Sequence, residues 1–273
     1  MVCPVKNESR RLHDWILYHA HQGVELFVMF DDHSSDDTKD KIRDIANKYG
    51  LEIIIEDQDR IGDVIPDEYA MRPDKYYFNQ SMCDRILRCL TKGNQIIKNI
   101  DPEYAVALLD IDEFVVTGGK ENLRTVVDQT FGERSEDCPS RKQILVNSFD
   151  VTPLYEWKDR WTTEDTTKDR WSIEETSNHK VWKTRCKPII VSKYMDECVF
   201  CHVPFEEFKD PSWNIHAHAE LIFKARERYS VDPETIRMHH FRKPVLDTLP
   251  TVEDRTLIEK SKEAREFFLG DKK

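Results

Sequence analysis

The sequence is poor in glycine, and this scarcity excludes two large classes of nucleotide-binding enzyme. The whole chain of 273 residues contains eight glycines: Gly23, Gly50, Gly62, Gly93, Gly118, Gly119, Gly132 and Gly270. Their spacing permits neither the glycine-rich fingerprint of dinucleotide-binding proteins nor a P-loop, because both need glycines where the backbone approaches a phosphate. Dehydrogenases of the usual kind and P-loop kinases are therefore excluded.

The chain also lacks an excess of basic residues and lacks a long apolar run. Acidic residues outnumber basic ones by 52 to 41, which gives a formal net charge of −11. Because phosphate binding needs a basic face, no nucleic-acid partner is expected. No apolar stretch approaches the roughly 18 residues of a membrane span, and the N-terminus carries no hydrophobic leader. These features predict a soluble, cytoplasmic protein without a transmembrane segment, and the odd number of cysteines, 7, predicts reduced thiols.

The first half of the sequence alternates between strand and helix patterns. An apolar strand over 1–6 is followed by a helix with Leu12, Trp15, Ile16 and His19 on one face, and Gly23 ends that helix. A continuous apolar strand over 24–30, a second helix running to Gly50 and a third strand over 51–55 come next. Two successive strand–helix–strand units predict an α/β fold with a parallel sheet.

The rest of the chain continues this pattern around one unusual segment. A helix is expected over about 76–92 and an amphipathic helix over about 252–268, and further strands are expected over 105–116, 143–151, 187–193, 197–205 and 236–242. Between 157 and 182 the near-repeat KDRWTTEDTT–KDRWSIEETS occupies 158–177, and four of the six tryptophans lie in this polar stretch. We interpret it as a long loop or hairpin inserted in the domain, whose tryptophans contact an acceptor or pack the loop onto the body.

The most informative strand is AVALLDIDEFVV, over 105–116. In a strand, residues i and i+2 face the same side, so Asp110 and Asp112 are expected to project together. Two carboxylates held together repel unless a cation lies between them, and hard oxygen ligands select Mg²⁺ or Mn²⁺. The alternative is a solvated turn whose acids cap the next element, but open α/β sheets place ligands beyond the carboxyl ends of their strands.

A second acidic pair, Asp31-Asp32, ends the apolar strand over 24–30 and should lie on the same rim of the sheet. The simpler interpretation of this pair is a helix N-cap with favourable charge near the helix dipole, a role that Asp36 and Asp37 can also fill. Two acidic strand ends on one rim nevertheless favour a ligand site there.

Two segments that contain these acidic residues resemble a known family of enzymes. The stretch KNESRRLHDWILYHAHQGVELFVMFDDHSSDDT, followed by a strand that ends LLDIDEFVV, resembles the glycosyltransferases of the GT-A fold. It is most similar to glycosyltransferase family 92 and the related short family-2-like bacterial and viral enzymes. Weaker similarities continue through Lys187-Pro188-Ile189, Cys201-His202-Val203-Pro204 and His239-His240-Phe241, so the resemblance spans most of residues 3–245. The insert over 157–182 and the lack of a membrane anchor depart from the eukaryotic Golgi members, so a removed Golgi anchor or a viral origin stays open.

The resemblance implies an inverting sugar transfer from a nucleotide-sugar donor, usually UDP-linked, to a glycan or glycoprotein acceptor, with Mn²⁺ or Mg²⁺ on the diphosphate. Galactose and xylose are reasonable donor sugars. By position, Lys6, Asn7, Glu8, Asp31 and Asp32 would border the nucleotide. Asp110 would approach the ribose or the metal, Asp112 would be the main metal ligand, and His240, chosen over His239 and His202, would complete the coordination. Inversion needs a carboxylate that takes a proton from the acceptor hydroxyl, and Asp150 and Glu207 are the candidates beside the alternative that each is an ordinary surface acid.

The expected architecture is therefore a single GT-A-type domain over 1–273, with a mostly parallel central sheet flanked by helices and the polar tryptophan-rich insert. Residues 1–116 would form the nucleotide-sugar half, 117–245 the acceptor half and 246–273 a C-terminal helix. Two other functions use the same residues: a metal-dependent phosphohydrolase or nucleotidyltransferase, and a non-catalytic carbohydrate-binding protein. A phosphatase of the haloacid dehalogenase type would carry its Asp-X-Asp on the first strand, which this chain does not.

Overall fold

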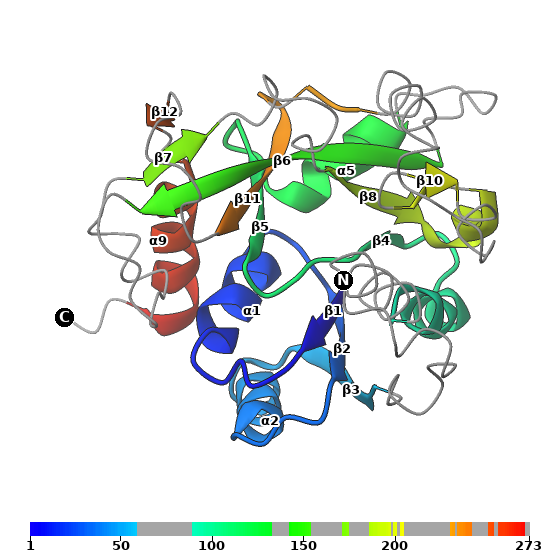
Figure 1. Ribbon diagram of the computed structural model, residues 1–273, viewed down its shortest axis with the longest axis vertical. Coiled ribbons are helices and arrows are strands. Elements are labelled where there is room, and N and C mark those ends of the chain that lie inside the picture. Colours follow the sequence, from blue (N-terminus) through cyan, green and yellow to red (C-terminus); the bar gives the residue numbers. More distant parts are fainter. Residues whose placement is uncertain are drawn as a thin grey trace, which may run out of the picture.

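The computed structural model describes residues 1–58, 89–132, 142–153, 171–174, 186–197, 199–200, 203–204, 230–232, 234–241, 251–253 and 256–270. Within these ranges the chain has an α/β fold, as the sequence predicts (Figure 1). No helix in the described ranges has the length and apolar character needed to cross a membrane.

A parallel sheet forms the N-terminal part of the fold. Its strands are β1 (Val2–Val5), β2 (Leu26–Asp31) and β3 (Glu52–Asp57), in that order, and the crossover helices are α1 (Leu12–His21) and α2 (Thr38–Tyr49). The two glycines predicted to end the helices have left-handed backbones, with φ of 92° at Gly23 and 66° at Gly50. This conformation favours glycine because it has no β-carbon. The predicted strand–helix order of this region is confirmed.

This sheet is covered by helices on both faces (Figure 1). Along β1 and β2, alternate side chains point to opposite sides, as the pleat of a strand requires. Cys3, Phe27 and Met29 pack into the core on the side of α1 and α2, whereas Val28 and Phe30 belong to a second core with the helical residues 89–100. The continuous apolar run of β2 thus reflects burial on both faces.

The second sheet is mixed rather than mostly parallel. Strands β12, β7, β6, β11 and β5 lie in that order, and β8 pairs with both β6 and β4. Its strands are β4 (Ala105–Ala107), β5 (Glu113–Thr117), β6 (Gln143–Pro153), β7 (Trp171–Glu174), β8 (Cys186–Val191), β11 (Ile236–Phe241) and β12 (Thr251–Glu253). Among the described strands of this sheet only β6 and β11 run parallel. The expectation of a mostly parallel sheet therefore holds for β1–β3 alone, because an apolar run reveals a strand but not the direction of its neighbour.

The two sheets meet where β1 passes the end of β4. Leu108 forms a parallel bridge with Val2, and the backbone N–H of Leu109 donates to the Val2 carbonyl at 3.0 Å. The carboxyl end of β4 is thereby brought to the same edge as the carboxyl end of β1.

The remaining described elements lie around the second sheet. They are α5 (Leu123–Gly132), the short 3-10 helix η4 (Ser192–Glu197), the small strands β9 (Val199–Phe200) and β10 (Val203–Pro204), and the C-terminal α9 (Thr256–Leu269). The amphipathic helix expected over about 252–268 begins at Thr256, because 251–253 form β12. Leu257, Ser261 and Ala264 are buried along one stripe of α9, and Phe268 packs partly buried against the core. Of the predicted insert over 157–182, residues 171–174 form β7 and all the rest lies outside the described residues, as does 76–88 of the helix expected over 76–92. The side chains of Cys3 and Cys89 are buried.

The strand expected over 105–116 is interrupted. β4 ends at Ala107 and β5 begins at Glu113, and the chain changes its neighbour between them, from β8 to β11. Residues 110–113 form a turn, closed by a hydrogen bond of 3.0 Å from the N–H of Glu113 to the carbonyl of Asp110. The sequence predicts that Asp110 and Asp112 project together from one face of a strand. This expectation is wrong, because both residues lie in a turn. We call residues 110–113 the acidic turn.

Helix α1 holds the strand that follows the acidic turn. β5 ends the described sheet, and side chains of α1 bond its outer backbone groups: Trp15 Nε1 donates to the Glu113 carbonyl at 2.8 Å, and Tyr18 donates to the Val115 carbonyl at 3.0 Å. His19 accepts from the N–H of Val115 at 3.5 Å through Nε2, while its Nδ1 lies 2.9 Å from the Trp15 carbonyl. Burial lowers the pKa of His19 to about 3, so its ring is neutral. Trp15, Tyr18 and His19, which belong to the stretch that carries the family resemblance, thus have a structural role.

Replacing Trp15 by Phe should destabilise the fold by about 2 kcal/mol, because the buried Glu113 carbonyl loses its donor and the ring leaves a gap. Tyr18→Phe, which removes one hydroxyl and little volume, should cost about 1 kcal/mol. Urea denaturation measures both free energies of unfolding. If Trp15→Phe matched the wild type, the side-chain bonds from α1 to β5 would contribute nothing to stability.

Candidate functional site

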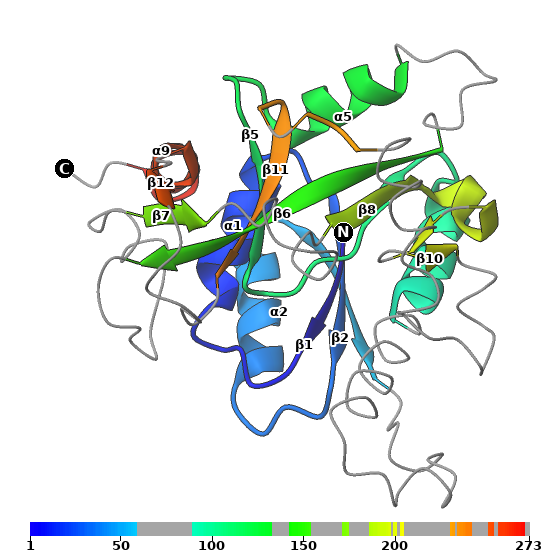
Figure 2. The ribbon, with the colours of Figure 1, turned by 45° about the horizontal axis from the view of Figure 1, so that its top comes forward.

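Acidic and polar side chains gather at one edge of the parallel sheet. Asp31 is the last residue of β2 and aligns with Val5 at the end of β1 and with Asp57 at the end of β3. The acidic turn follows β4, which bridges β1 in parallel, and therefore lies on the same edge. We call this edge, toward which β1 and β2 run side by side in Figure 2, the strand-end rim. The predicted placement of both acidic clusters on one rim is confirmed.

The acidic turn is fixed by a buried glutamate and a lysine. Glu113 is 2% exposed, and its Oε2 accepts the backbone N–H of Asp110 at 2.9 Å. Lys187, from β8, places its Nζ 2.9 Å from Glu113 Oε2 and 3.2 Å from Asp110 Oδ2. Burial raises the pKa of Glu113, although the charge of Lys187 opposes that rise. The sequence motif includes both residues but does not place Lys187 beside the acidic turn, because the two are brought together only by strand pairing.

Asp112 faces a histidine from the far end of the chain. Its Oδ2 lies 3.6 Å from Nε2 of His240, which is 7% exposed on β11. Burial acts to raise the pKa of Asp112, but hydrogen bonding and charge from His240 outweigh it, so the pKa lies below its ordinary value. His240 thus lies beside Asp112, and its role as a metal ligand stays a prediction. His239, the neighbour on β11, is buried as well and alternates to the opposite face.

Of the two candidate bases, the structure describes only the backbone of Asp150. The backbone of Asp150 pairs directly with that of His240 in the parallel β6–β11 ladder, so this residue stands in the strand next to the Asp112–His240 pair. Its side chain is outside the described atoms. Glu207 and His202 lie outside the described residues.

The pKa of Glu8, on the strand-end rim, is well above its ordinary value. The pKa of this half-buried carboxyl is raised to about 7, first by burial and then by the charges of Asp112, Asp36 and Asp110, while Arg11 opposes the shift. Its Oε2 lies 3.4 Å from Arg11 Nη1. Three aspartates thus lie close enough to Glu8 to repel its carboxylate, which is the condition that a bound cation would relieve.

The raised pKa of Glu8 should make the stability of the protein depend on pH. Because the pKa of Glu8 is about 7 in the folded protein and 4.5 ordinarily, the folded state keeps a proton that the unfolded state releases between these pH values. The free energy of unfolding contributed by Glu8 therefore falls as pH rises from about 4.5 to about 7, by roughly 3 kcal/mol. Glu8→Gln should be more stable than wild type at pH 8 and should show a flatter profile. Urea denaturation at pH 5 and pH 8 measures this, and parallel profiles would contradict it.

The other residues predicted to border the nucleotide hold two loops together. Asn7, with a φ of 55°, accepts the N–H of Ser35 at 2.8 Å through Oδ1 and donates its own N–H to Ser34 Oγ at 2.9 Å. The Glu8 N–H donates to Thr38 Oγ1 at 2.9 Å. Lys6 lies 3.1 Å from Asp32 Oδ2. These contacts shape the wall of the rim between β1 and α2, so the Lys-Asn-Glu motif has at least this structural role.

At the ends of β2 and β3, some buried polar atoms have no partner among the described residues. Asp31 is fully buried; its Oδ2 accepts the Ser34 N–H at 3.1 Å and lies 3.3 Å from Lys39 Nζ. Gln58, which follows β3 and is 5% exposed, donates its backbone N–H to the Asp31 carbonyl at 2.9 Å. Within the described ranges, Asp31 Oδ1 and both amide atoms of Gln58 have no hydrogen-bond partner. Such atoms are costly to leave unsatisfied, so they favour a polar ligand here. Gln58 was not predicted, although a polar residue directly after an apolar strand is the signal that singled out Asp31.

The rim offers donor atoms suited to a hard divalent cation. Across the described residues no three His, Cys, Asp or Glu side chains form a metal-ligand cluster. The Asp112–His240 pair supplies one oxygen and one nitrogen 3.6 Å apart. Two neighbouring ligands of an octahedral Mg²⁺ lie about 3 Å apart, and such an ion usually keeps waters and phosphate oxygens as its other ligands. Asp112 and His240 could therefore supply two of the ligands of Mn²⁺ or Mg²⁺ bound together with a diphosphate.

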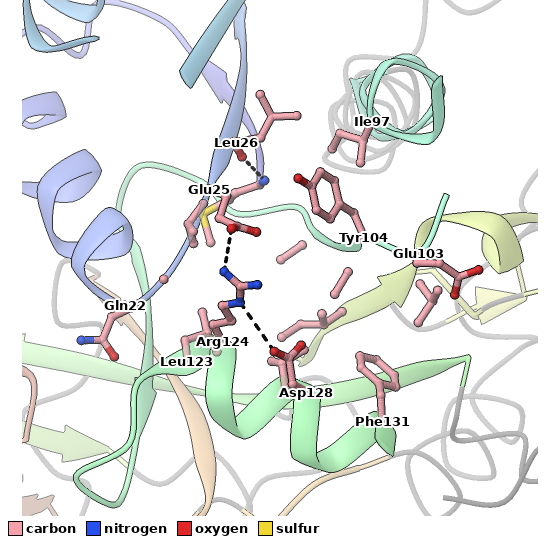
Figure 3. A pocket seen from close by; sticks show the side chains of 18 of the residues that line it. Gln22, Glu25, Leu26, Ile97, Glu103, Tyr104, Leu123, Arg124, Asp128 and Phe131 are labelled. Atoms are coloured by element: carbon pink, nitrogen blue, oxygen red, sulfur yellow. Dashed lines mark hydrogen bonds and ion pairs between the residues drawn. The ribbon is translucent and has the colours of Figure 1, made fainter. Parts of the chain in front are cut away.

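A cavity of about 570 Å³ lies at the opposite, amino ends of the strands (Figure 3). Leu26 of β2, Ala105 of β4 and Val127 of α5 contribute to its walls. At its edge Arg124 lies 2.6 Å from Glu25 Oε1 and 3.6 Å from Asp128 Oδ2. None of the predicted site residues lines it, so it is separate from the strand-end rim.

Comparisons with known proteins give no assignment. No family model and no curated protein matches the chain. A solved structure described as "Crystal Structure of a Mycobacterial Protein" aligns with 98% of this chain and 74% of its own, at 11% identity and a TM-score of 0.35. A similarity at that level supports no conclusion about fold family or function.

Proposed function

We propose that the protein is a metal-dependent inverting glycosyltransferase of the GT-A type. It would move a sugar, such as galactose or xylose, from a UDP-linked donor to a hydroxyl of a glycan or glycoprotein. The observation that carries the proposal is the Asp112–His240 pair at 3.6 Å, with Asp110 and Glu8 nearby, on the rim where the parallel strands end. Open α/β sheets bind ligands at this edge, and the rim combines excess negative charge with oxygen and imidazole donors.

The donor would lie along the rim with its base at β2 and β3 and its diphosphate at the acidic turn. Asp31 Oδ1 and the Gln58 amide have no partner among the described residues, which supports the first half of this arrangement, because a carboxylate oxygen accepts a hydrogen bond and an amide both donates and accepts. A uracil edge offers an N–H flanked by carbonyl oxygens, which matches that set. Asn7 and Glu8 would support the loops on either side.

Asp112 and His240 would hold the cation, and Asp110 would approach the ribose or the metal. When bound, the cation neutralises charge that develops on the departing diphosphate. The chain itself would orient the donor through the rim and accept the proton of the attacking hydroxyl. Asp150 is the preferred acceptor of that proton, because its backbone is paired with His240. Glu207 is the alternative.

A donor screen tests this proposal. The protein is incubated with Mn²⁺ and each of several UDP-sugars, with and without oligosaccharide acceptors, and the released UDP and the glycan products are measured. We expect transfer with one donor, lost in EDTA, with the anomeric configuration inverted in the product. Release of inorganic phosphate or pyrophosphate would instead support a phosphohydrolase or nucleotidyltransferase. Glycan binding without any release would support a carbohydrate-binding protein.

A further inference from the structure

Lys187 is the cation closest to the acidic turn in the described structure. Its side chain is only 14% exposed, and its Nζ contacts both Glu113 Oε2, at 2.9 Å, and Asp110 Oδ2, at 3.2 Å. Glu113 is nearly inaccessible, with 3% of its side chain exposed, and Asp110 is the more open partner, with 39% exposed. One ammonium thus connects a buried acid to an acid that faces the rim.

The sheet explains why a lysine of β8 reaches this point. β4 pairs with β8 through Ala107 and Ile189, and β4 ends there, whereas β8 extends two residues further to Lys187. Because the strands are antiparallel, this overhang carries Lys187 alongside the residues that follow β4, which are those of the acidic turn. On its other side β8 is fixed by pairing of Lys187 with Val146 of β6. The position of the ammonium is therefore set by the sheet rather than by a surface loop.

The contacts of Glu113 give Lys187 a role in shaping the acidic turn. The same Oε2 that meets Lys187 also accepts the Asp110 N–H at 2.9 Å, so the side chain of Glu113 closes the turn that its own backbone N–H closes from the other end. A buried carboxylate without a cation would be neutralised or expelled to water. Lys187 therefore helps to keep Glu113 in place, and with it the turn that presents Asp112 to His240.

We propose that Lys187 is a positioning residue that acts as a built-in counter-ion for the acidic turn and competes with a divalent cation for Asp110. This inference rests on the proposed function. In the protein without metal, Lys187 offsets the charge of the acidic turn. When a metal-bound diphosphate occupies the rim, the cation takes over that role at Asp110, and the ammonium is available to a phosphate oxygen. The metal alone should then bind weakly, and the metal with the nucleotide should bind strongly.

Calorimetric titration of Mn²⁺ and of UDP tests this proposal in the wild type and in Lys187→Met. Removing one positive charge near the cation should tighten binding of Mn²⁺ alone by about tenfold, since unit charges a few ångströms apart interact by more than 1 kcal/mol near a protein surface. Binding of UDP at saturating Mn²⁺ should weaken by about tenfold, because the diphosphate loses a charged partner. Opposite signs of the two changes are the signature, since a variant that merely distorted the turn would weaken both.

Two further variants control for folding and charge. Lys187→Arg keeps the charge and should keep both affinities within about threefold of the wild type. The double variant Lys187→Met/Glu113→Gln removes both buried charges, so its affinity for Mn²⁺ should return to the wild-type value while its affinity for UDP stays low. If Lys187→Met does not fold, the double variant carries the test. Unchanged or weaker Mn²⁺ binding by Lys187→Met, with the wild type binding both ligands, would overturn the counter-ion role alone. A wild type that binds neither Mn²⁺ nor UDP would overturn the proposed function together with it.

Discussion

Asp112→Asn should abolish sugar transfer, lowering kcat by at least about 10³-fold, because the amide cannot supply the negative oxygen that the cation needs when charge develops on the diphosphate. Mn²⁺-dependent binding of UDP should disappear in the same variant. The fold should change little, because Asp112 lies in a turn at the rim rather than in the core and its contact with His240, at 3.6 Å, is long. Asparagine also keeps the size of the side chain. Transfer kinetics, UDP calorimetry and the melting temperature together measure these effects.

Asp128→Asn is a matched control for this variant. Asp128 is an exposed carboxylate on α5 at the edge of the cavity at the amino ends of the strands, far along the sheet from the rim. The substitution removes the same charge and should leave transfer and UDP binding within about twofold of the wild type, because exposed ion pairs contribute little. Full activity in Asp112→Asn would show that the assigned metal ligand is wrong.

Asp31→Asn should lower the affinity for UDP by about 10- to 100-fold, since a charge-assisted hydrogen bond contributes about 1.5–3 kcal/mol. The reason is the burial of this side chain: its Oδ1 is enclosed and lacks a partner within the described residues, so a ligand N–H would be its natural donor. An amide oxygen can still accept from the Ser34 N–H, which lies 3.1 Å from Oδ2 in the wild type. The loop after β2 should therefore survive the substitution.

The control for Asp31→Asn is Asp57→Asn. Both aspartates contact Lys39, but Asp57 is exposed at the end of β3 and has no part in the buried polar group. Calorimetry should show that Asp57→Asn retains UDP affinity within about twofold. Equal losses of UDP affinity in the two variants would mean that Lys39, rather than Asp31 Oδ1, determines binding. The proposed position of the uracil base would then be wrong.

The sequence predicted the N-terminal half well because its signals are local. Apolar runs marked β1, β2 and β3, Gly23 and Gly50 marked the ends of α1 and α2, and the polar residues directly after the strands marked the rim. Parallel order followed from the strand–helix alternation, since a crossover helix returns the chain to the same edge.

The second sheet and the acidic turn could not be predicted in the same way, because they depend on pairing between distant segments. The run 105–116 resembles one strand, but its two halves pair with β8 and β11, which lie far apart in sequence. The site residues also divide into those that the sequence could place and those that it could not. His240 was placed beside Asp112 through the family resemblance, whereas Lys187 meets Asp110 and Glu113 through the overhang of β8, which no local pattern encodes.

The role of the Lys-Asn-Glu motif also became clear only in three dimensions. The sequence suggested contacts with a nucleotide, and the structure shows Asn7 bonded to Ser34 and Ser35 and Glu8 bonded to Thr38. The raised pKa of Glu8, about 7, comes from burial and from carboxylates of the acidic turn that lie about a hundred positions away in the chain. Charge interactions of this kind are fixed by the fold.

The central claim is that the rim binds a metal and a nucleotide diphosphate together, and thermal unfolding with UDP, UDP-sugars and Mn²⁺ tests it most directly. A ligand that binds only the native state raises the melting temperature by mass action. We predict a rise with UDP and with one UDP-sugar in Mn²⁺, and a much smaller rise with Mn²⁺ alone or with either nucleotide in EDTA. An unchanged melting temperature with every nucleotide in the presence of Mn²⁺ would contradict the account.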